Sequence, residues 1–255
     1  MNWLLGLLSL LLAAAMLPAR GAELSAERVR EILVAAAPGH PADLSGKSLA
    51  ELDLSRFNFR GANLARANLF GAKLVDADFT DADLSGAKLD LAWIMRANFT
   101  AANLSKASLL GLVVASGLDY SPGEAPTFKR ANFSGAHILA RLSRFDLSGA
   151  NFAGAKLGAD RKNQSMGLMR TDLSGANLAG ANFSNADLGL VLLRFANLTG
   201  ADLRGANLSE ADLSGADLTA ADLTGANATE ADFGGAVLTK ARGLAAMTGW
   251  KPPPR

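Results

Sequence analysis

Only two histidines, His40 and His137, could act as a conventional general base at neutral pH. The chain of 255 residues has no cysteine, which excludes disulfides, thiolate catalysis and cysteine-ligated zinc. His40 lies between two proline-containing turns, and no recognisable motif places a nucleophile or a carboxylate beside either histidine. The sequence therefore predicts a protein that is not an enzyme.

Metal and phosphate sites are not predicted either. The many aspartates follow a regular spacing that distributes them over different sides of the molecule, and they lack the loop spacing of a calcium site. Gly46-Lys47-Ser48 matches the end of a phosphate-binding loop, but the first glycine of that motif would fall at Pro41. We therefore expect no cofactor and no metal.

The elements that carry these side chains are repeats of five residues. Between Thr171 and Leu238 every fifth residue is Leu or Phe, except Ala228, and Ala usually stands two positions before it. This period suits neither a helix, which repeats near 3.6 residues, nor a flat strand, which alternates at 2. It fits a chain that turns a corner after each repeat, with the Leu or Phe and the earlier Ala pointing inward.

The phenylalanines give the length of one coil. Phe59, Phe79 and Phe99 recur at every fourth repeat, which is the spacing expected if four such sides close one coil. In successive coils they would form a ladder at roughly 4.8 Å, the distance between hydrogen-bonded strands. The spacing thus predicts an all-β solenoid.

The repeat resembles the A(D/N)LXX motif of the pentapeptide-repeat family, and the resemblance extends over most of the chain. It implies a right-handed quadrilateral β-helix. The handedness comes from the resemblance and not from the spacing.

The N-terminus is typical of a secretory signal peptide. Residues 3–18 form an apolar run that ends at Pro18, and small residues follow at Ala19, Gly21 and Ala22. No Lys or Arg precedes the run, and an uncleaved anchor is the alternative. The run is, however, shorter than the ~20 residues that a membrane-spanning helix needs. We expect a signal peptide over residues 1–22, a periplasmic or secreted protein, and no membrane span after the leader is removed.

A helix is predicted to cap the solenoid over residues 23–39. Ser25 can serve as its N-cap, and Val29, Ile32 and Leu33 share one face. Such a cap would cover the unpaired edge that an open solenoid presents.

The solenoid itself is expected over residues 40–240, with two loops. Two Pro and two Gly near 115–127 indicate the first loop. The second lies near 158–167, after which the pattern resumes at Leu168. Between the loops the spacing slips by one residue before Leu142, which would place Phe133 beside Phe152. A C-terminal cap and tail are expected over residues 241–255.

Charge is distributed unevenly along the predicted rod. Residues 115–170 contain four acidic and eight basic side chains, whereas residues 171–238 contain nine acidic and two basic ones. This could form a bipolar surface for partners. The simpler interpretation is that Asp is the common outward residue of the repeat.

Apolar residues at outward positions are more informative, because such positions should be polar or small. A contiguous exposed apolar patch indicates an interface. The alternative is that the loop near 115–127 covers the first cluster. The candidate partner surface consists of a first cluster, Phe70, Leu91, Trp93, Met95, Leu110 and Val113, and a second cluster, Leu190, Leu192 and Phe195.

These observations favour a non-catalytic, exported binding or scaffold protein that engages a protein partner or a second copy through its outer faces, with no nucleic-acid ligand. The resemblance supplies an alternative, since some family members protect gyrase by mimicking DNA. That function would require a cytosolic protein. Those members are acidic over their length, whereas this chain has a net charge of +1 and a basic middle.

Overall fold

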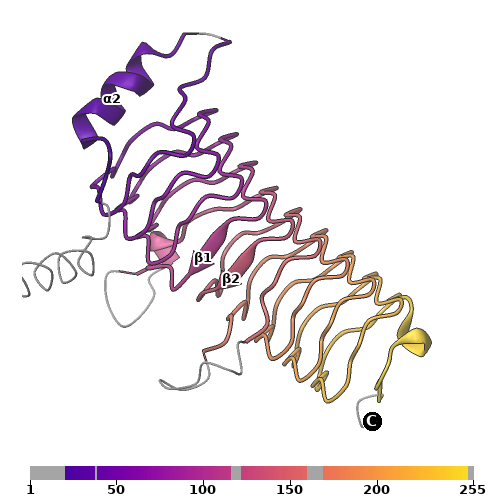
Figure 1. Cartoon of the computed structure of the whole chain (residues 1–255). Coiled ribbons are helices and arrows are strands. Elements are labelled where there is room, and N and C mark those ends of the chain that lie inside the picture. The colour runs from indigo at the N-terminus through magenta and orange to yellow at the C-terminus, as the bar shows by residue number, and fades with distance from the viewer. Residues whose placement is uncertain (1–20, 38, 116–121, 160–168, 252–255) are drawn as a thin grey trace, which may run out of the picture.

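The computed structural model describes residues 21–37, 39–115, 122–159 and 169–251. The chain forms an elongated stack of coils, with helix α2 beside the N-terminal end (Figure 1). The named elements are short: α2 (Ala26–Ala35), strands β1 (Ser108–Leu110) and β2 (His137–Leu139), and the 3-10 helices η1 (Pro122–Glu124) and η2 (Leu244–Ala246).

Successive coils are joined by parallel backbone bridges. Asp43 pairs with Asn63, and Asn63 pairs in turn with Asp83, so that one regular coil consists of four repeats. In each step the backbone N–H groups donate along the rod, as from Leu44 to the Asn63 carbonyl (2.8 Å) and from Asn63 to the Ala42 carbonyl (2.9 Å). Within each uninterrupted block the bridge residues recur at every fifth position, so they form four columns along the rod. The fold is thus a β-solenoid.

The core is a narrow column of Ala, Leu and Phe. Ala97 and Phe99 are 1% and 0% exposed, while Asn98 between them is half-buried. The rings of Phe59 and Phe79 stack at 4.7 Å, and those of Phe79 and Phe99 at 4.8 Å. These distances confirm the predicted phenylalanine ladder.

Most corners are four-residue turns closed by a backbone hydrogen bond, as from the Ala62 N–H to the Phe59 carbonyl (2.9 Å). The third residue of the turn has a positive φ, 65° at Gly61, a conformation that glycine adopts without steric cost. Arg66 and Ala101 adopt it as well, with φ of 60° and 57°. A non-glycine residue costs about 1–2 kcal/mol in this conformation, which the packing between coils must offset.

The first interruption changes the register between coils. Asn98 pairs with Thr127, well beyond the regular interval, so the extra residues lie between Val113 and Thr127. Thr127 therefore belongs to the solenoid and not to the loop. Thr127 then pairs with Asp146, one position short of the regular interval, which confirms the one-residue slip.

The phenylalanine stack continues across this change of register. Phe133 stacks on Phe152 at 4.8 Å, as the slip predicts. Phe99 also stacks on Phe128 at 4.8 Å, although these residues lie on opposite sides of the loop. The core is therefore continuous through the first interruption.

The second interruption lies between Lys156 and Asp172, which belong to neighbouring columns. Leu168 itself lies outside the described residues. With Leu168 as a repeat centre, a further column would lie between Lys156 and Asp172, yet Asp172 occupies the column directly after that of Lys156. Five-residue spacing predicts the column of a residue only where the repeats are uninterrupted. Across the interruption the column depends on how the coils stack, and here Phe152 stacks on Phe183 at 4.7 Å.

Thr171 joins the coils at this point. It occupies a position that usually holds Ala, and it is fully buried. Its hydroxyl lies 3.0 Å from the Ile138 carbonyl oxygen and 2.8 Å from that of Leu157. A buried hydroxyl requires such partners, so Thr171 satisfies backbone groups where the regular ladder is broken.

Helix α2 lies beside the N-terminal end of the solenoid. The Ser25 hydroxyl accepts a hydrogen bond from the Arg28 N–H (3.1 Å), and Val29 is fully buried in the core. Residues ahead of α2 add one more pairing to the first coil, because the Glu23 N–H donates to the Ser48 carbonyl (2.8 Å). In the described part of the chain, no helix has the length and apolarity needed to cross a membrane.

At the C-terminal end, the rings of Phe233 and Trp250 pack in a T-shaped arrangement with their centroids 5.0 Å apart. Both residues are at least partly buried. The predicted tail beyond Lys251 lies outside the described residues.

Candidate partner-binding surface

Two runs of bridge residues, Lys73, Trp93 and Val113, and Arg141, Asp172, Leu192 and Asp212, follow one another along the rod. Val113 and Arg141 come directly after the paired Ser108 and His137 in successive coils, so we treat the two runs as one column, the Trp93 column. Three of the four irregularities in the bridge pattern adjoin it, and the fourth, one extra residue between Arg242 and Thr248, lies at the C-terminal end in other columns. The first interruption follows Val113, the one-residue slip precedes Arg141, and the second interruption precedes Asp172. Insertions in repeat proteins gather on one side, which is often the binding side.

The first cluster of the candidate surface lies on this side. Trp93 and Val113 are paired members of the column, and Leu91 occupies the corner that leads into it. Trp93 and Phe70 are each 40% exposed and Leu91 is 49% exposed, whereas Leu110 and Val113 are half-buried. These side chains form a partly exposed apolar surface.

Two of the predicted residues are not exposed. Met95 is 6% exposed and Leu190 is 8% exposed. Their positions in the repeat are outward, but the fold buries both side chains. They therefore contribute little area that a partner could contact.

The second cluster lies further along the same side of the rod. Leu192 belongs to the Trp93 column, and Phe195 occupies the corner that follows it. Phe195 is 73% exposed, and its ring extends toward Gly215, where a Cβ atom would lie only 2.4 Å from ring carbons. The two clusters, which the sequence presents separately, thus share one side of the molecule.

A shallow groove of about 550 Å³ lies beside the second cluster. Sequence reasoning missed it, because the register across the second interruption brings its coils together. The Arg144 side chain forms part of its edge and extends toward Gly175, where a Cβ would meet Arg144 Cγ at 3.3 Å. The residues that matter for its chemistry are Arg141, Arg144, Asp172, Gly175, Arg194 and Phe195.

Arg194 is held by a carboxylate of the next coil. Its Nε donates to the Asp212 carboxylate, which also accepts hydrogen bonds from the Ser214 hydroxyl (2.6 Å) and N–H (3.1 Å). Burial raises the pKa of the Asp212 carboxyl, but these hydrogen bonds outweigh it and hold the pKa below its usual value. The same contact raises the pKa of the Arg194 guanidinium.

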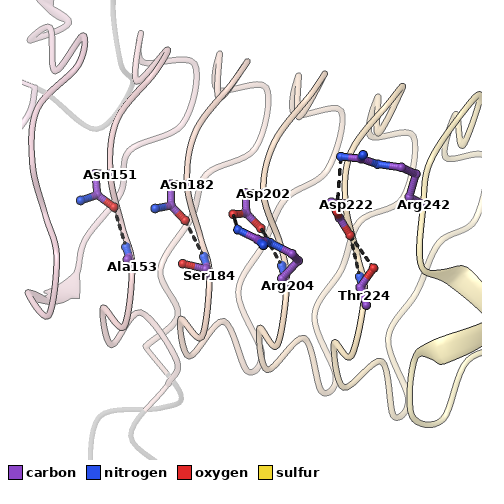
Figure 2. Close-up of polar contacts among 9 residues, drawn as sticks. All are labelled: Asn151, Ala153, Asn182, Ser184, Asp202, Arg204, Asp222, Thr224 and Arg242. Atoms are coloured by element: carbon purple, nitrogen blue, oxygen red, sulfur yellow. Dashed lines mark hydrogen bonds and ion pairs between the residues drawn. The ribbon is translucent and has the colours of Figure 1, made fainter.

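Outward Asn and Asp side chains accept a hydrogen bond from the backbone N–H two residues later in the same repeat. Asn151 Oδ1 accepts from the Ala153 N–H (3.1 Å), and Asn182 Oδ1 accepts from the Ser184 N–H (2.9 Å), as Figure 2 shows. This pattern recurs along the rod and explains the regular spacing of these residues by local structure.

The acidic residues of the C-terminal coils are similarly engaged. Asp202 pairs with Arg204 at 2.6 Å, and Asp222 pairs with Arg242 at 3.3 Å (Figure 2). Asp187, Asp212, Asp217 and Asp222 lie in four different columns. Their charge is therefore spread around the rod instead of forming a strip on one side.

Neither histidine belongs to a metal-binding cluster among the described residues. His40 and His137 occupy exposed positions in different parts of the solenoid. Within the described ranges, no cluster of His, Cys, Asp and Glu is arranged to hold a metal ion.

Comparison with protein families finds a match to the model of pentapeptide repeats, in eight copies, over residues 48–86, 62–100, 168–205, 186–225 and 216–242. No curated protein matches the chain.

Similar solved structures include those of three proteins. HetL, a pentapeptide repeat protein involved in heterocyst differentiation regulation from the cyanobacterium Nostoc sp. strain PCC 7120, is 26% identical, with 89% of this chain and 98% of that chain covered and a TM-score of 0.49. Rfr23 from the cyanobacterium Cyanothece 51142 is 27% identical, with 60% and 88% covered and a TM-score of 0.35. QnrB1, a plasmid-mediated fluoroquinolone resistance protein, is 21% identical, with 78% and 84% covered and a TM-score of 0.38.

Proposed function

The chain belongs to the pentapeptide-repeat family, and on that basis we propose that it is a non-catalytic binding module that engages a protein partner through the side of the Trp93 column. The observation that carries this proposal is the coincidence of two features. The exposed apolar residues Phe70, Leu91, Trp93 and Phe195 gather on or beside this column, and three of the four irregularities of the bridge pattern adjoin it. Keeping a large apolar side chain in water forgoes about 1.5–3 kcal/mol of stabilisation that burial would provide.

The proposal includes a particular architecture. The four bridge columns are the sides of a right-handed quadrilateral coil, and α2 caps its first coil. The burial of Val29 in the core supports the cap. On this geometry one flat side presents the Trp93 column to a partner, with a corner on either edge.

The proposal also includes export to the periplasm or secretion. The apolar run of residues 3–18 and the small residues Ala19, Gly21 and Ala22 support it. The expected mature chain starts near Ala22 or Glu23. Intact-mass measurement on protein from the native host tests this. A full-length mass that retains Trp3 would reject cleavage.

The partner surface is tested by Trp93→Glu, which places a charge on the exposed column without changing the buried Ile94. The matched control is Val237→Glu, because Val237 is 45% exposed but pairs with Asp217 in a different column. Both variants should melt close to the wild type. Quantitative affinity purification from the native host, with light scattering to detect a second copy, should show an association that Trp93→Glu abolishes and Val237→Glu retains.

Two outcomes would contradict the proposed surface. An association that survives Trp93→Glu unchanged would place the interface elsewhere. A monomeric wild type, in which Trp93→Glu lowers the stability and increases proteolysis near 115–127, would show that the chain covers its own apolar residues.

The alternative function, DNA mimicry toward a type II topoisomerase, rests on the nine acidic and two basic residues of positions 171–238. A DNA mimic presents regularly spaced negative charge along one side. The four-column distribution of the aspartates and the pairing of Asp202 and Asp222 with arginines argue against it. Protection of gyrase supercoiling by the purified chain would restore this alternative.

A further inference from the structure

We propose that the groove lined by Arg141, Arg144 and Arg194 binds an acidic segment of the partner protein. This inference rests on the proposed function, because the groove lies on the same side of the rod as the two apolar clusters. It adds the chemistry of the partner: carboxylates at the groove, with apolar residues toward both clusters.

The groove has an excess of positive charge. Three arginines and one carboxylate, Asp172, line it. Arg194 is paired with Asp212, and Asp172 Oδ1 accepts a hydrogen bond from the Ser174 N–H (2.9 Å). Within the part of the chain that the structure describes, Arg141 and Arg144 make no ion pair, and both are exposed. Two guanidinium groups are thus available to an incoming anion.

Guanidinium groups are well suited to carboxylates. Their planar donors match both oxygens of a carboxylate, and such charge-assisted pairs are stronger than neutral hydrogen bonds. Gly175 keeps the floor of the groove open beneath Arg144, and the exposed Phe195 ring provides an apolar wall. The groove can therefore receive carboxylates beside an apolar side chain.

The position of the groove sets the length of the partner segment. Within the Trp93 column, Val113, Arg141 and Asp172 lie between Trp93 and Leu192, one residue in each coil. Trp93 and Leu192 are therefore four coil spacings apart. At about 4.8 Å per coil this is roughly 19 Å, which an extended chain spans with about six residues. A segment with apolar residues about six positions apart and carboxylates between them would contact both clusters and the groove.

A nucleic acid fits this surface less well. Its phosphates would continue beyond the groove onto coils with nine acidic and only two basic residues. Like charges placed in register oppose binding. The short basic stretch between apolar clusters therefore favours a peptide over a polyanion.

The test uses the fluorescein-labelled peptide LEEDEEF and fluorescence anisotropy with the purified full chain. Its matched control peptide is LQQNQQF, which lacks the charges. The double variant Arg141→Glu/Arg144→Glu should weaken binding of LEEDEEF by about tenfold or more, since charge reversal replaces attraction by repulsion.

The control variant is Arg66→Glu/Arg130→Glu, which changes the net charge by the same amount. Arg66 and Arg130 are exposed corner arginines with φ of 60° and 55°, close to the 63° of Arg144. Like Arg144, each extends over a glycine of the next coil, Gly86 and Gly149 respectively. This control should weaken binding less than about twofold.

Three results would overturn the inference: equal weakening by both double variants, equal binding of the two peptides, or binding of a labelled oligothymidylate that exceeds that of LEEDEEF. If the peptide fails to bind but Trp93→Glu still abolishes association with a partner, the proposed acidic segment is refuted and the proposed function is not. If Trp93→Glu abolishes no association, the proposed function itself is refuted.

Discussion

At the scale of single residues, the corner position governs both backbone strain and side-chain placement. Long corner side chains extend toward the next coil and lie over the glycine at the equivalent corner, as Arg66 does over Gly86 and Phe195 over Gly215. Glycine can therefore be favoured at a corner for two separate reasons. It avoids the cost of a left-handed backbone, and it can leave room for the side chain from the previous coil.

These two reasons can be separated by a pair of substitutions. Gly61 and Gly215 have φ of 65° and 67°, but a Cβ at Gly61 would meet nothing within 4 Å, whereas one at Gly215 would meet the Phe195 ring at 2.4 Å. Gly61→Ala should cost about 1–2 kcal/mol through the backbone alone. Gly215→Ala should cost more in urea melts.

The Phe195→Ala background provides the control for this pair. Without the ring, the cost of Gly215→Ala should fall to that of Gly61→Ala. Equal costs of the two substitutions in the wild type would show that the corner side chain moves aside freely.

The core allows a second residue-scale prediction. Phe99 stacks between Phe79 and Phe128 and is fully buried, so Phe99→Ala should cost about 3–5 kcal/mol through the cavity it leaves. Ala97→Leu should overpack the same layer and cost roughly 1–3 kcal/mol. Asn98→Ser, on the half-buried outward position, should cost least. Urea melts in which Asn98→Ser is the worst of the three would invert the assigned faces.

At the scale of elements, contacts between coils depend on ionised carboxylates. Asp212 has a pKa below the unfolded-state value of 3.8, chiefly because hydrogen bonds from Ser214 and Arg194 overcome the effect of burial. A lowered folded pKa contributes stability above pH 3.8, and that contribution is lost as the pH falls through the folded pKa.

We expect Asp212→Asn to remove this contribution. The free energy of unfolding of the variant should lie below that of the wild type at pH 7, and the gap should narrow as the pH decreases below about 4. Urea midpoints measured from pH 7 to 2.5 test it. A gap that stays constant over this range would show that ionisation of Asp212 is not linked to folding.

The sequence predicts the elements well where the repeat is uninterrupted. Spacing alone identifies the inward positions of Ala97 and Phe99 and the stack of phenylalanines. It does not predict the closure after the second interruption, because the length of an insertion says nothing about which column the chain rejoins.

The candidate surface was predicted less completely. Position in the repeat tells which way a Cβ points, but not how far a flexible side chain is covered, so the burial of Met95 and Leu190 could not be anticipated. The union of both apolar clusters beside the Trp93 column depends on the register across both interruptions. The arginine groove depends on it too, since Arg141 and Asp172 are bridged across the second interruption.

At the scale of the whole molecule, each coil contacts only its neighbours, so complete coils should be removable. Deletion of residues 201–220 would place Asp232 at the position of Asp212 and Gly235 at that of Gly215. Both replacements preserve the contacts of Arg194 and Phe195. We expect a cooperative urea transition and an unchanged circular dichroism spectrum per residue.

Deletion of residues 201–215 is the matched control. It shifts every later residue by one column, so that Arg194 would face Asn227 and Phe195 would meet Glu230. This shorter deletion should be more destabilising than the longer one. If stability simply followed the number of residues removed, the register between coils would not be what stabilises the rod.

Within an uninterrupted block, the surface neighbours of a residue are those at the same position of every fourth repeat. Residues that are adjacent in the gene therefore face different directions, and a binding side is assembled from single residues contributed by separate coils. A tandem duplication of one coil would separate Trp93 from Leu192 by one more spacing while leaving the surroundings of both unchanged. In this protein the distances between binding residues can therefore change in evolution independently of the residues themselves.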